Sequence, residues 1–205
     1  MTKRLMAAIV LLTVVAAGCS TNEPGTPAPG PGDGSSAAPP ATTTSASRPG
    51  VDLPPRPQDL PIDGIAKPCD LFTDAQREQL RVDRARDTVS RGEVYEGQQR
   101  CALTLEGGDP YLDVSVLLVT SEGAEAWLAG DRNVTAEQTS IEGFGAAHYW
   151  LAGGEGAECN TAVDVADGQH LQVGLLMPGE GWAQEKLCET TDQVAAAALK
   201  TLQAG

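Results

Sequence analysis

Apolar and polar residues alternate along several short stretches in the second half of the chain, which is the pattern of half-buried β-strands. The clearest stretch is 111–119, where leucines and valines take every second position, opposite Asp113 and Ser115. The same alternation predicts four more strands, at 100–106, 146–151, 159–165 and around 171–173. About five strands are therefore expected.

Three other stretches carry helical signals. Thr73 and Gln76 are spaced as in a capping box and predict that a short helix begins there. A second short helix is expected at 121–130, with a serine as its N-cap. In the C-terminal stretch 183–203, small and apolar residues recur at helical spacing on one face, and this inward face includes Cys188.

The turn after the strand at 159–165 sets the register of a predicted hairpin. A two-residue turn would place apolar residues on both sides of the sheet. A three-residue loop with its glycine in the left-handed region instead pairs Val163 with Leu171 and keeps the apolar residues together. It also pairs Asp164 with His170, so we expect His170 to be the outward-facing partner of a carboxylate.

The predicted order is helix, strand, strand, helix, strand, strand, strand, helix. Short hairpin connections join most of the strands. This order predicts an α+β fold: a single domain over 62–205 with an antiparallel sheet of about five strands and helices on one face.

The N-terminus has the pattern of a bacterial lipoprotein signal. Lys3 and Arg4 precede an apolar segment, and small residues stand before Cys19. We expect 1–18 to be the signal peptide and Cys19 to carry the lipid, which places the protein on the extracytoplasmic face of the cell membrane. The alternatives are a transmembrane helix, for which the segment falls short of about 20 residues, and an ordinary secretory signal, which Ala16 leaves open because lipoprotein signals usually have leucine there.

Residues 19–61 are rich in proline, glycine, serine and threonine and have almost no large apolar side chains. Such a segment cannot bury a core, so we expect a disordered tether. The whole chain is acidic, with a formal net charge of −14. This charge disfavours nucleic acid and anionic lipid as electrostatic partners, so the expected membrane attachment depends on the lipid.

The chain contains five cysteines, and lipid on Cys19 leaves four. In an exported protein four cysteines indicate two disulfides, and the chain has no Cys-x-x-Cys pair that would favour a metal. Cys69 and Cys188 lie on or beside predicted helices, whereas Cys101 and Cys159 lie on predicted strands. If each bridge joins a helix to the sheet, the favoured pairs are Cys69–Cys101 and Cys159–Cys188. Spacing alone leaves the other two pairings open.

The sequence contains no catalytic motif that we recognise. His148 stands beside aromatic residues, which is typical of a packed strand position. Acidic pairs such as Glu155 with Glu158 and Asp164 with Asp167 are expected by chance among 28 acidic residues, and we interpret them as solvated surface. We expect no metal and no cofactor.

Basic residues gather in one part of this acidic chain. If the first helix continues past residue 80, three of these arginines share one face and form a docking patch for an anionic ligand or partner. Interleaved acidic residues favour the alternative of a locally neutralised surface. The candidate residues are Arg77, Arg81, Arg84, Arg86 and Arg91, with Arg100 close behind in the sequence.

The order of several short motifs adds a family resemblance. The domain opens with Pro-Cys-Asp-Leu-Phe-Thr at 68–73, carries Cys101 on a strand, and has Gly-Phe-Gly-Ala-Ala at 143–147 before another strand. Cys159 then begins a strand, and Cys188 lies in the closing helix. In this order and cysteine spacing the chain resembles actinobacterial lipoproteins that carry the domain of unknown function 3558. The resemblance implies an exported, lipid-anchored, disulfide-bonded domain, and it implies no activity.

Together these patterns lead us to expect a monomeric, membrane-anchored lipoprotein with a non-enzymatic binding or accessory role in the cell envelope. Its partner would be an envelope protein or a small ligand. Two alternatives remain, an envelope hydrolase with an unrecognised active site and a carrier of an apolar ligand. The low aromatic content of 4% argues against the carrier.

Overall fold

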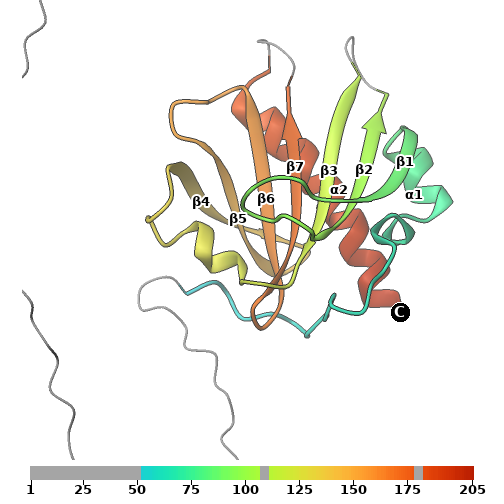
Figure 1. Ribbon diagram of the computed structural model, residues 1–205, viewed down its shortest axis with the longest axis horizontal. Coiled ribbons are helices and arrows are strands. Elements are labelled where there is room, and N and C mark those ends of the chain that lie inside the picture. Colours follow the sequence, from blue (N-terminus) through green and yellow to red (C-terminus); the bar gives the residue numbers. More distant parts are fainter. Residues whose placement is uncertain (1–51, 107–110, 178–181) are drawn as a thin grey trace, which may run out of the picture. The chain divides into compact units, whose positions relative to one another are not determined.

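The computed structural model describes residues 52–106, 111–177 and 182–205 (Figure 1). The elements follow one another as η1 (Pro68–Leu71), α1 (Asp74–Gln79), β1 (Val82–Val89), β2 (Gln99–Leu105), β3 (Leu112–Val119), η2 (Ala124–Trp127), β4 (Val134–Ile141), β5 (Phe144–Leu151), β6 (Glu158–Ala166), β7 (Gln169–Leu176) and α2 (Gln184–Ala204). The two η elements are single turns of 3-10 helix.

The described residues form one antiparallel sheet of seven strands in the order β1-β2-β3-β7-β6-β5-β4. Two meanders, β1-β2-β3 and β4-β5-β6-β7, join where β7 pairs with β3 (Figure 1). The antiparallel sheet is as predicted, but the expected number of about five strands is too low.

The two strands that the sequence analysis missed, β1 and β4, are the edges of the sheet. Their side chains are exposed or half-buried along most of their length, so neither strand has a clean apolar alternation. β4 is joined to β5 by a tight turn in which Glu142 and Gly143 have φ of 50° and 84°. Positive φ at both central residues is typical of a type I′ hairpin turn.

The predicted first helix begins as expected but is short. Thr73 and Gln76 form a capping box, since each side chain bonds the backbone N–H of the other residue. The helix ends at Gln79, and Arg81 then has φ of 56° before the chain enters β1. A positive φ is costly for a residue with a Cβ and is incompatible with a continuing α-helix. The condition under which Arg77, Arg81 and Arg84 would share a helix face is therefore not met.

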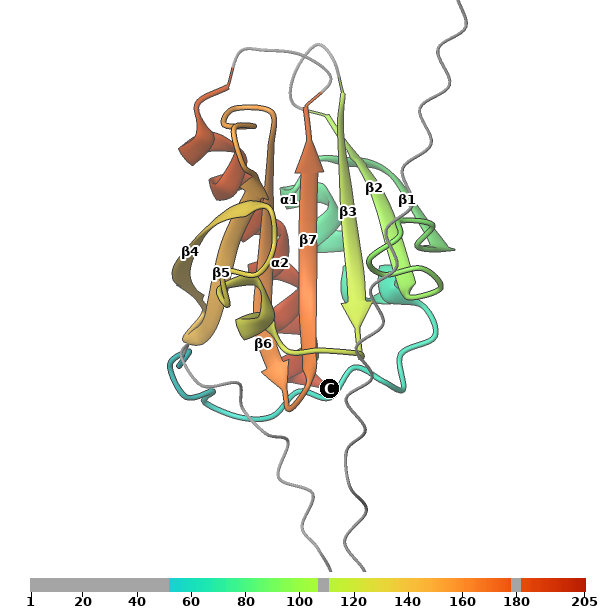
Figure 2. The same ribbon diagram turned by 60° about the vertical axis from the view of Figure 1, so that its left-hand side comes forward.

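One face of the sheet is covered by α2, which lies across β6 and β7, and by η1. Figure 2 shows α2 behind the sheet and η2 in front of it. The apolar face of α2 buries Leu187, Val194, Ala198 and Leu199 against the strands. The expectation of helices on one face holds for α2, but the predicted helix at 121–130 is only the turn η2, and it packs on the opposite face against β5 and β6.

Two disulfides connect the covering helices to the sheet. Cys69 of η1 is bonded to Cys101 of β2, and Cys159 of β6 is bonded to Cys188 of α2. These are the pairs that the local patterns favoured. All four cysteines are buried, so both bridges lie in the core rather than at its rim.

The β6–β7 hairpin has the predicted register. Val163 pairs with Leu171, and Asp164 pairs with His170. The loop itself differs from the prediction, because Ala166 pairs with Gln169 and closes a two-residue turn. A bulge between Asp164 and Ala166 takes up the extra residue, so the apolar residues stay on one side of the sheet.

The chain before residue 62 makes specific contacts with this hairpin. Arg56 bonds both carboxylate oxygens of Asp164 at 2.8 and 2.9 Å and Asp167 at 2.5 Å. The backbone N–H of Leu60 donates to the carbonyl of Val165 at 2.7 Å, and Leu60 itself is buried. The last part of the predicted tether 19–61 is therefore packed against the domain, whereas residues 1–51 lie outside the described residues.

We expect Arg56→Met to lower the free energy of unfolding by about 2 kcal/mol, because it leaves a half-buried carboxylate without its charged partner. Burial already raises the pKa of Asp164, and the Arg56 guanidinium opposes that rise. Urea unfolding of the variant at neutral pH measures the effect. Arg84→Met is the matched control, since Arg84 is exposed beside Asp83 and should cost no more than about 0.5 kcal/mol. Equal losses in the two variants would contradict this role of Arg56.

Candidate functional site

The face of the sheet opposite α2 carries a groove that runs across four strands. Its floor is one row of paired residues: Ala102 of β2, Ser115 of β3, Gly174 of β7 and Asn160 of β6. Three of these four residues are small. The row is therefore lower than its neighbours, and the groove encloses about 460 Å³, which is within the range of small-molecule sites.

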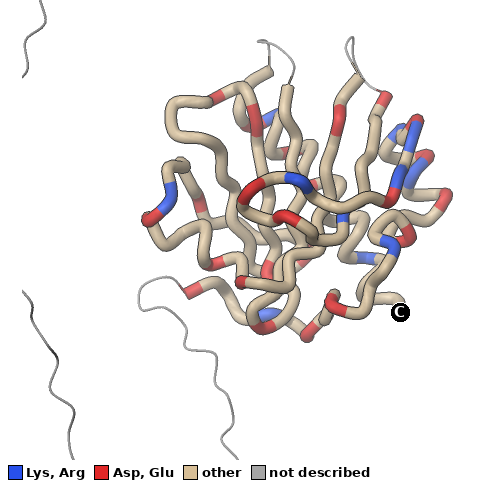
Figure 3. Tube along the Cα trace, in the orientation of Figure 1, with Lys and Arg blue, Asp and Glu red and all other residues tan. Residues whose placement is uncertain are grey.

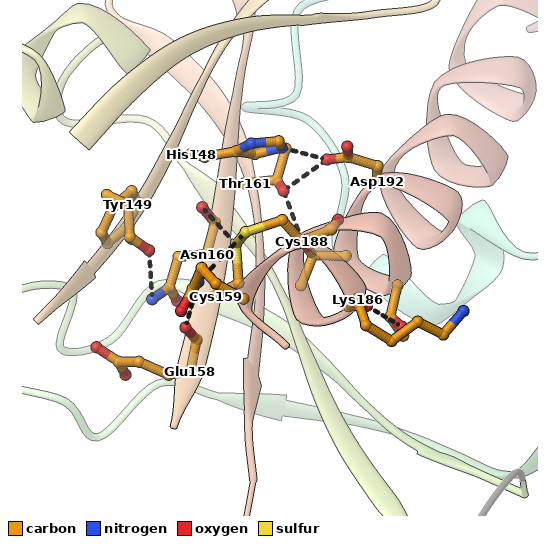
Figure 4. Close-up of a disulfide and its surroundings, with 12 residues drawn as sticks. His148, Tyr149, Glu158, Cys159, Asn160, Thr161, Lys186, Cys188 and Asp192 are labelled. Atoms are coloured by element: carbon orange, nitrogen blue, oxygen red, sulfur yellow. Dashed lines mark hydrogen bonds and ion pairs between the residues drawn. A yellow bond between two sulfur atoms is a disulfide. The ribbon is translucent and has the colours of Figure 1, made fainter. Parts of the chain in front are cut away.

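Gly174 keeps the floor low. A Cβ added at this glycine would lie 2.5 Å from Oδ1 of Asn160, a distance that no real Cβ contact tolerates. The Asn160 side chain is in turn held by a hydrogen bond of 3.3 Å from Nδ2 to the carbonyl of Tyr149 (Figure 4). A glycine inside a strand often marks a place where another group approaches closely, and this was the sequence signal that could have indicated the groove.

The rows on either side form the walls of the groove. One wall is the row of Arg100, Leu117 and Gln172, and the opposite wall holds Asp113 and Glu158. The rim next to the second wall is apolar and exposed. It consists of Tyr111, which is 55% exposed, and Leu176, which is 64% exposed.

A smaller aromatic hollow of about 240 Å³ adjoins the first wall and shares Gln172 with the groove. Tyr95, Trp127 and Tyr149 line it. Trp127 stacks on Tyr149 with ring centroids 3.6 Å apart, and Tyr95 meets the edge of Trp127 at 6.1 Å. The open face thus offers a polar compartment and an aromatic compartment side by side.

A charged cluster holds the loops that carry these aromatic residues. Glu122 accepts hydrogen bonds from Tyr95 at 2.5 Å and from Arg132 at 2.6 Å, and the Arg132 guanidinium lies 4.1 Å from the centre of the Trp127 ring. Burial alone would raise the pKa of Glu122, but the hydrogen bonds from Arg132 and Tyr95 outweigh it and lower the pKa. Burial raises the pKa of Tyr95, so this phenol stays protonated and remains a donor.

His170 lies beneath this cluster and is fully buried. Its Nδ1 is 3.0 Å from the carbonyl oxygen of Glu122, and its Nε2 is 3.4 Å from the Tyr95 hydroxyl. Burial lowers the pKa of His170 to about 4. His170 lies opposite Asp164 in the register, as expected. It is buried and does not face outward, and Arg56 bonds both oxygens of that carboxylate.

Several polar atoms that belong to the two compartments lack a partner. Six side-chain atoms in the described residues are buried without a hydrogen bond, and three of them belong to residues that line the groove or the aromatic hollow. These are Nε of Arg100, Nε1 of Trp127 and Oε1 of Gln172. The Gln172 side chain interacts with His170 and raises the pKa of that histidine against the effect of burial, although Oε1 of Gln172 has no hydrogen-bond partner. Unpaired buried polar atoms are costly, so the residues around the two compartments are not arranged for stability alone.

The structure divides the predicted arginine patch. Figure 3 shows basic positions gathered around α1 and β1, with acidic positions between them. Arg77 bonds the carbonyl of Cys69 at 2.8 Å and is structural. Arg84 and Arg86 instead pair with Thr104 and Ala102 in the sheet. The register therefore places them on the same face as the groove.

The remaining arginines of the predicted patch have different positions. Arg81 lies between α1 and β1, and Arg91 lies in the loop after β1; both are exposed. Arg100, at the margin of the predicted patch, is the one that lines the groove.

His148 joins the sheet to α2 on the face away from the groove (Figure 4). Its Nε2 is 2.7 Å from Asp192, which also accepts a hydrogen bond from Thr161 at 2.9 Å. Thr161 in turn bonds Thr191. The hydroxyl next to His148 thus bonds the carboxylate and not the imidazole, and this geometry does not activate a nucleophile. The structural interpretation of His148 fits these contacts.

The two acidic pairs have different surroundings, and Asp164 is buried, so the interpretation of both pairs as solvated surface was wrong for this residue. Asp164 and Asp167 both bind Arg56. Glu158 lines the groove and accepts a hydrogen bond from the backbone N–H of Leu151, whereas Glu155 is exposed. Among the described residues, no group of three or more histidine, cysteine or acidic side chains is placed to hold a metal ion.

The predicted lipidation site, Cys19, and the predicted signal peptide lie outside the described residues. Within the part of the chain that the structure describes, no helix has both the length and the apolarity to cross a membrane.

Fold and groove together define a disulfide-bonded α+β domain with one covered and one open sheet face. A family model described as a protein of unknown function, DUF3558, matches residues 14–201. The chain belongs to this family. Comparison with curated proteins found no match, and comparison with solved structures found none either.

Proposed function

We propose that this protein is a non-enzymatic binding domain that is anchored to the outer face of the cell membrane through lipid on Cys19 and holds a ligand in the open-face groove. The observation that carries the proposal is the groove itself. Its floor is kept low by Gly174, and its walls present Arg100 and Gln172 with buried polar atoms that lack partners. The small residues of the floor leave room for a ligand between the two walls.

An envelope hydrolase is the second candidate, and one observation favours it: Asp113 and Glu158 line the same groove. They lie two strands apart, and Leu176 stands between them in the register. At about 4.8 Å per strand their backbones are roughly 10 Å apart, which is at the wide end for a carboxylate pair that cleaves glycosidic bonds. The apolar-carrier hypothesis has less support, because the groove walls are polar and the space under α2 is filled by core side chains.

Site-specific photocrosslinking tests the binding proposal. The full chain is expressed with its signal in a host that lipidates exported proteins, with benzoylphenylalanine in place of Leu176 at the groove rim. The matched control carries it in place of Val89, which is 45% exposed on the opposite face of β1. We expect a discrete crosslinked adduct from position 176 and none from position 89, and a mass for the N-terminal peptide that shows lipid on Cys19.

A second substitution in the crosslinking protein removes the groove. Ser115→Phe fills the floor between Ala102 and Gly174 and should abolish the adduct from position 176. Ser121→Phe, at an exposed loop position, should leave it unchanged. Equal crosslinking from positions 176 and 89, or an adduct that survives Ser115→Phe, would contradict binding in the groove.

A further inference from the structure

The charges of the groove are separated across its width. Arg100 stands in one wall, and Asp113 and Glu158 stand in the other, with the small residues of the floor between them. We propose that the ligand is a short peptide with both ends free, whose carboxylate binds Arg100 and whose ammonium group binds the wall that carries Asp113 and Glu158. This inference rests on the proposed binding function and names the ligand class of the same groove.

The cationic wall is suited to a carboxylate. Arg100 lines the groove, and a guanidinium binds a carboxylate through two parallel hydrogen bonds. Arg86 pairs with Ala102 and so stands at the end of the floor row on the same face. It adds a second positive charge near Arg100 in a protein whose net charge is −14.

The anionic wall is suited to an ammonium group. Thr104 donates to Oδ1 of Asp113 at 3.2 Å, and the backbone N–H of Leu151 donates to Oε1 of Glu158 at 2.7 Å. These bonds occupy one oxygen of each carboxylate and leave the other oxygen for a ligand. An ammonium group has three donors, and either carboxylate of this wall can accept from it.

The spacing of the two walls selects the length of the peptide. Leu117 and Asp113, which mark the two walls on β3, are four residues apart, or roughly 13 Å along the strand. A free amino acid is too short to bridge that distance. An extended tripeptide spans about 10 Å, and the Arg100 side chain reaches over the remainder.

The same features exclude simpler ligands. A plain anion at Arg100 would lie in a groove whose other wall repels it, and an apolar chain would bury Arg100 and Gln172 without hydrogen bonds. The aromatic hollow adjoins the wall of Arg100 and Gln172. It is therefore placed to receive the side chain of the C-terminal residue, and an aromatic residue there would pack against Tyr95 and Trp127.

Isothermal titration calorimetry of the full chain in mild detergent tests this inference, with the tripeptide Ala-Ala-Phe as the probe. Its N-acetylated and C-amidated forms are the comparison ligands. We expect the free tripeptide to bind at least tenfold more tightly than either blocked form. Arg100→Gln should weaken the free tripeptide at least tenfold and leave the affinity of the C-amidated form unchanged, and Arg91→Gln, at an exposed position outside the groove, should change neither.

Equal affinity for free and blocked peptides, or no binding of the free tripeptide at millimolar concentration, would overturn the assignment of a free-ended peptide. The crosslinking from position 176 decides the broader proposal separately. An adduct in the groove without tripeptide binding would mean that the groove holds a different class of ligand. The absence of both would end the binding proposal as well.

Discussion

Replacing Cys159 and Cys188 together with alanine is expected to lower the free energy of unfolding by about 3 to 4 kcal/mol. The bridge closes a loop with a sequence separation of 29 residues, and the loss of its constraint on the unfolded chain accounts for most of that value. Both sulfurs are buried where α2 meets β6, so their removal leaves the helix held by packing and by hydrogen bonds such as Thr161–Thr191 and His148–Asp192. Urea unfolding under non-reducing conditions measures the loss.

The Cys69–Cys101 bridge closes a loop of nearly equal separation, 32 residues, and its double alanine variant should lose a similar amount. Glu189→Ala on the exposed face of α2 is the control and should change stability by less than about 0.5 kcal/mol. A loss below about 1 kcal/mol on removal of either bridge would show that packing and hydrogen bonds hold the helix layer to the sheet without the disulfides.

The second large effect is the pH dependence that buried His170 produces. An unfolded histidine has a pKa of about 6.5, and burial in the folded protein lowers the pKa of His170 to about 4. As the pH falls below 6.5, His170 of the unfolded state binds a proton, whereas buried His170 of the folded state stays neutral until the pH is near 4. The free energy of unfolding therefore falls between pH 6.5 and 4 and is fully retained above that window. We expect a loss of about 2 kcal/mol between pH 7 and pH 5 from this residue.

His170→Asn isolates this contribution, because an amide can still donate to the carbonyl of Glu122 but does not titrate. In urea unfolding at pH 7, 6 and 5, the free energy of unfolding should fall more steeply with decreasing pH for the native chain than for the variant. Glu122 contributes only at lower pH, since its pKa lies below its usual value and its stabilisation is lost as the pH falls through that range. Parallel curves for the two proteins would contradict a buried neutral His170.

The sequence predicted best those features that one short segment decides. The register of the β6–β7 hairpin follows from the need to keep Val163 and Leu171 on one side. Local patterns likewise predicted the capping box at Thr73 and the inward face of α2. Each of these constraints acts within about ten to twenty residues, where a pattern has few competing solutions.

The features that the sequence did not predict depend on partners far apart in the chain. Asp164 is bonded by Arg56, 108 residues away, so its pairing with His170 in the register did not become a contact between their side chains. The groove floor combines residues from four strands, and its shape appears only once Ser115 and Gly174 are aligned. The edge strands β1 and β4 were missed because edges are half-solvated and therefore lack a clean apolar alternation.

The two faces of the sheet have different roles. One side of the sheet carries the core, the disulfides and α2, and these fix the strands in place. The other side holds few covering elements, η2 and the loop after β1, which the cluster of Glu122, Tyr95 and Arg132 secures beside the aromatic hollow. A rigid sheet under an open groove is suited to binding, because little conformational entropy is lost when a ligand enters.

Native mass spectrometry of the lipid-anchored protein, released in mild detergent from the membranes in which it was made, tests the central claim most directly. The account predicts a non-covalently bound mass that is present in the native chain, retained in Ser121→Phe and lost in Ser115→Phe. A native chain that carries no additional mass, or a mass that remains when residue 115 fills the groove, would contradict the assignment of the open face as a binding site.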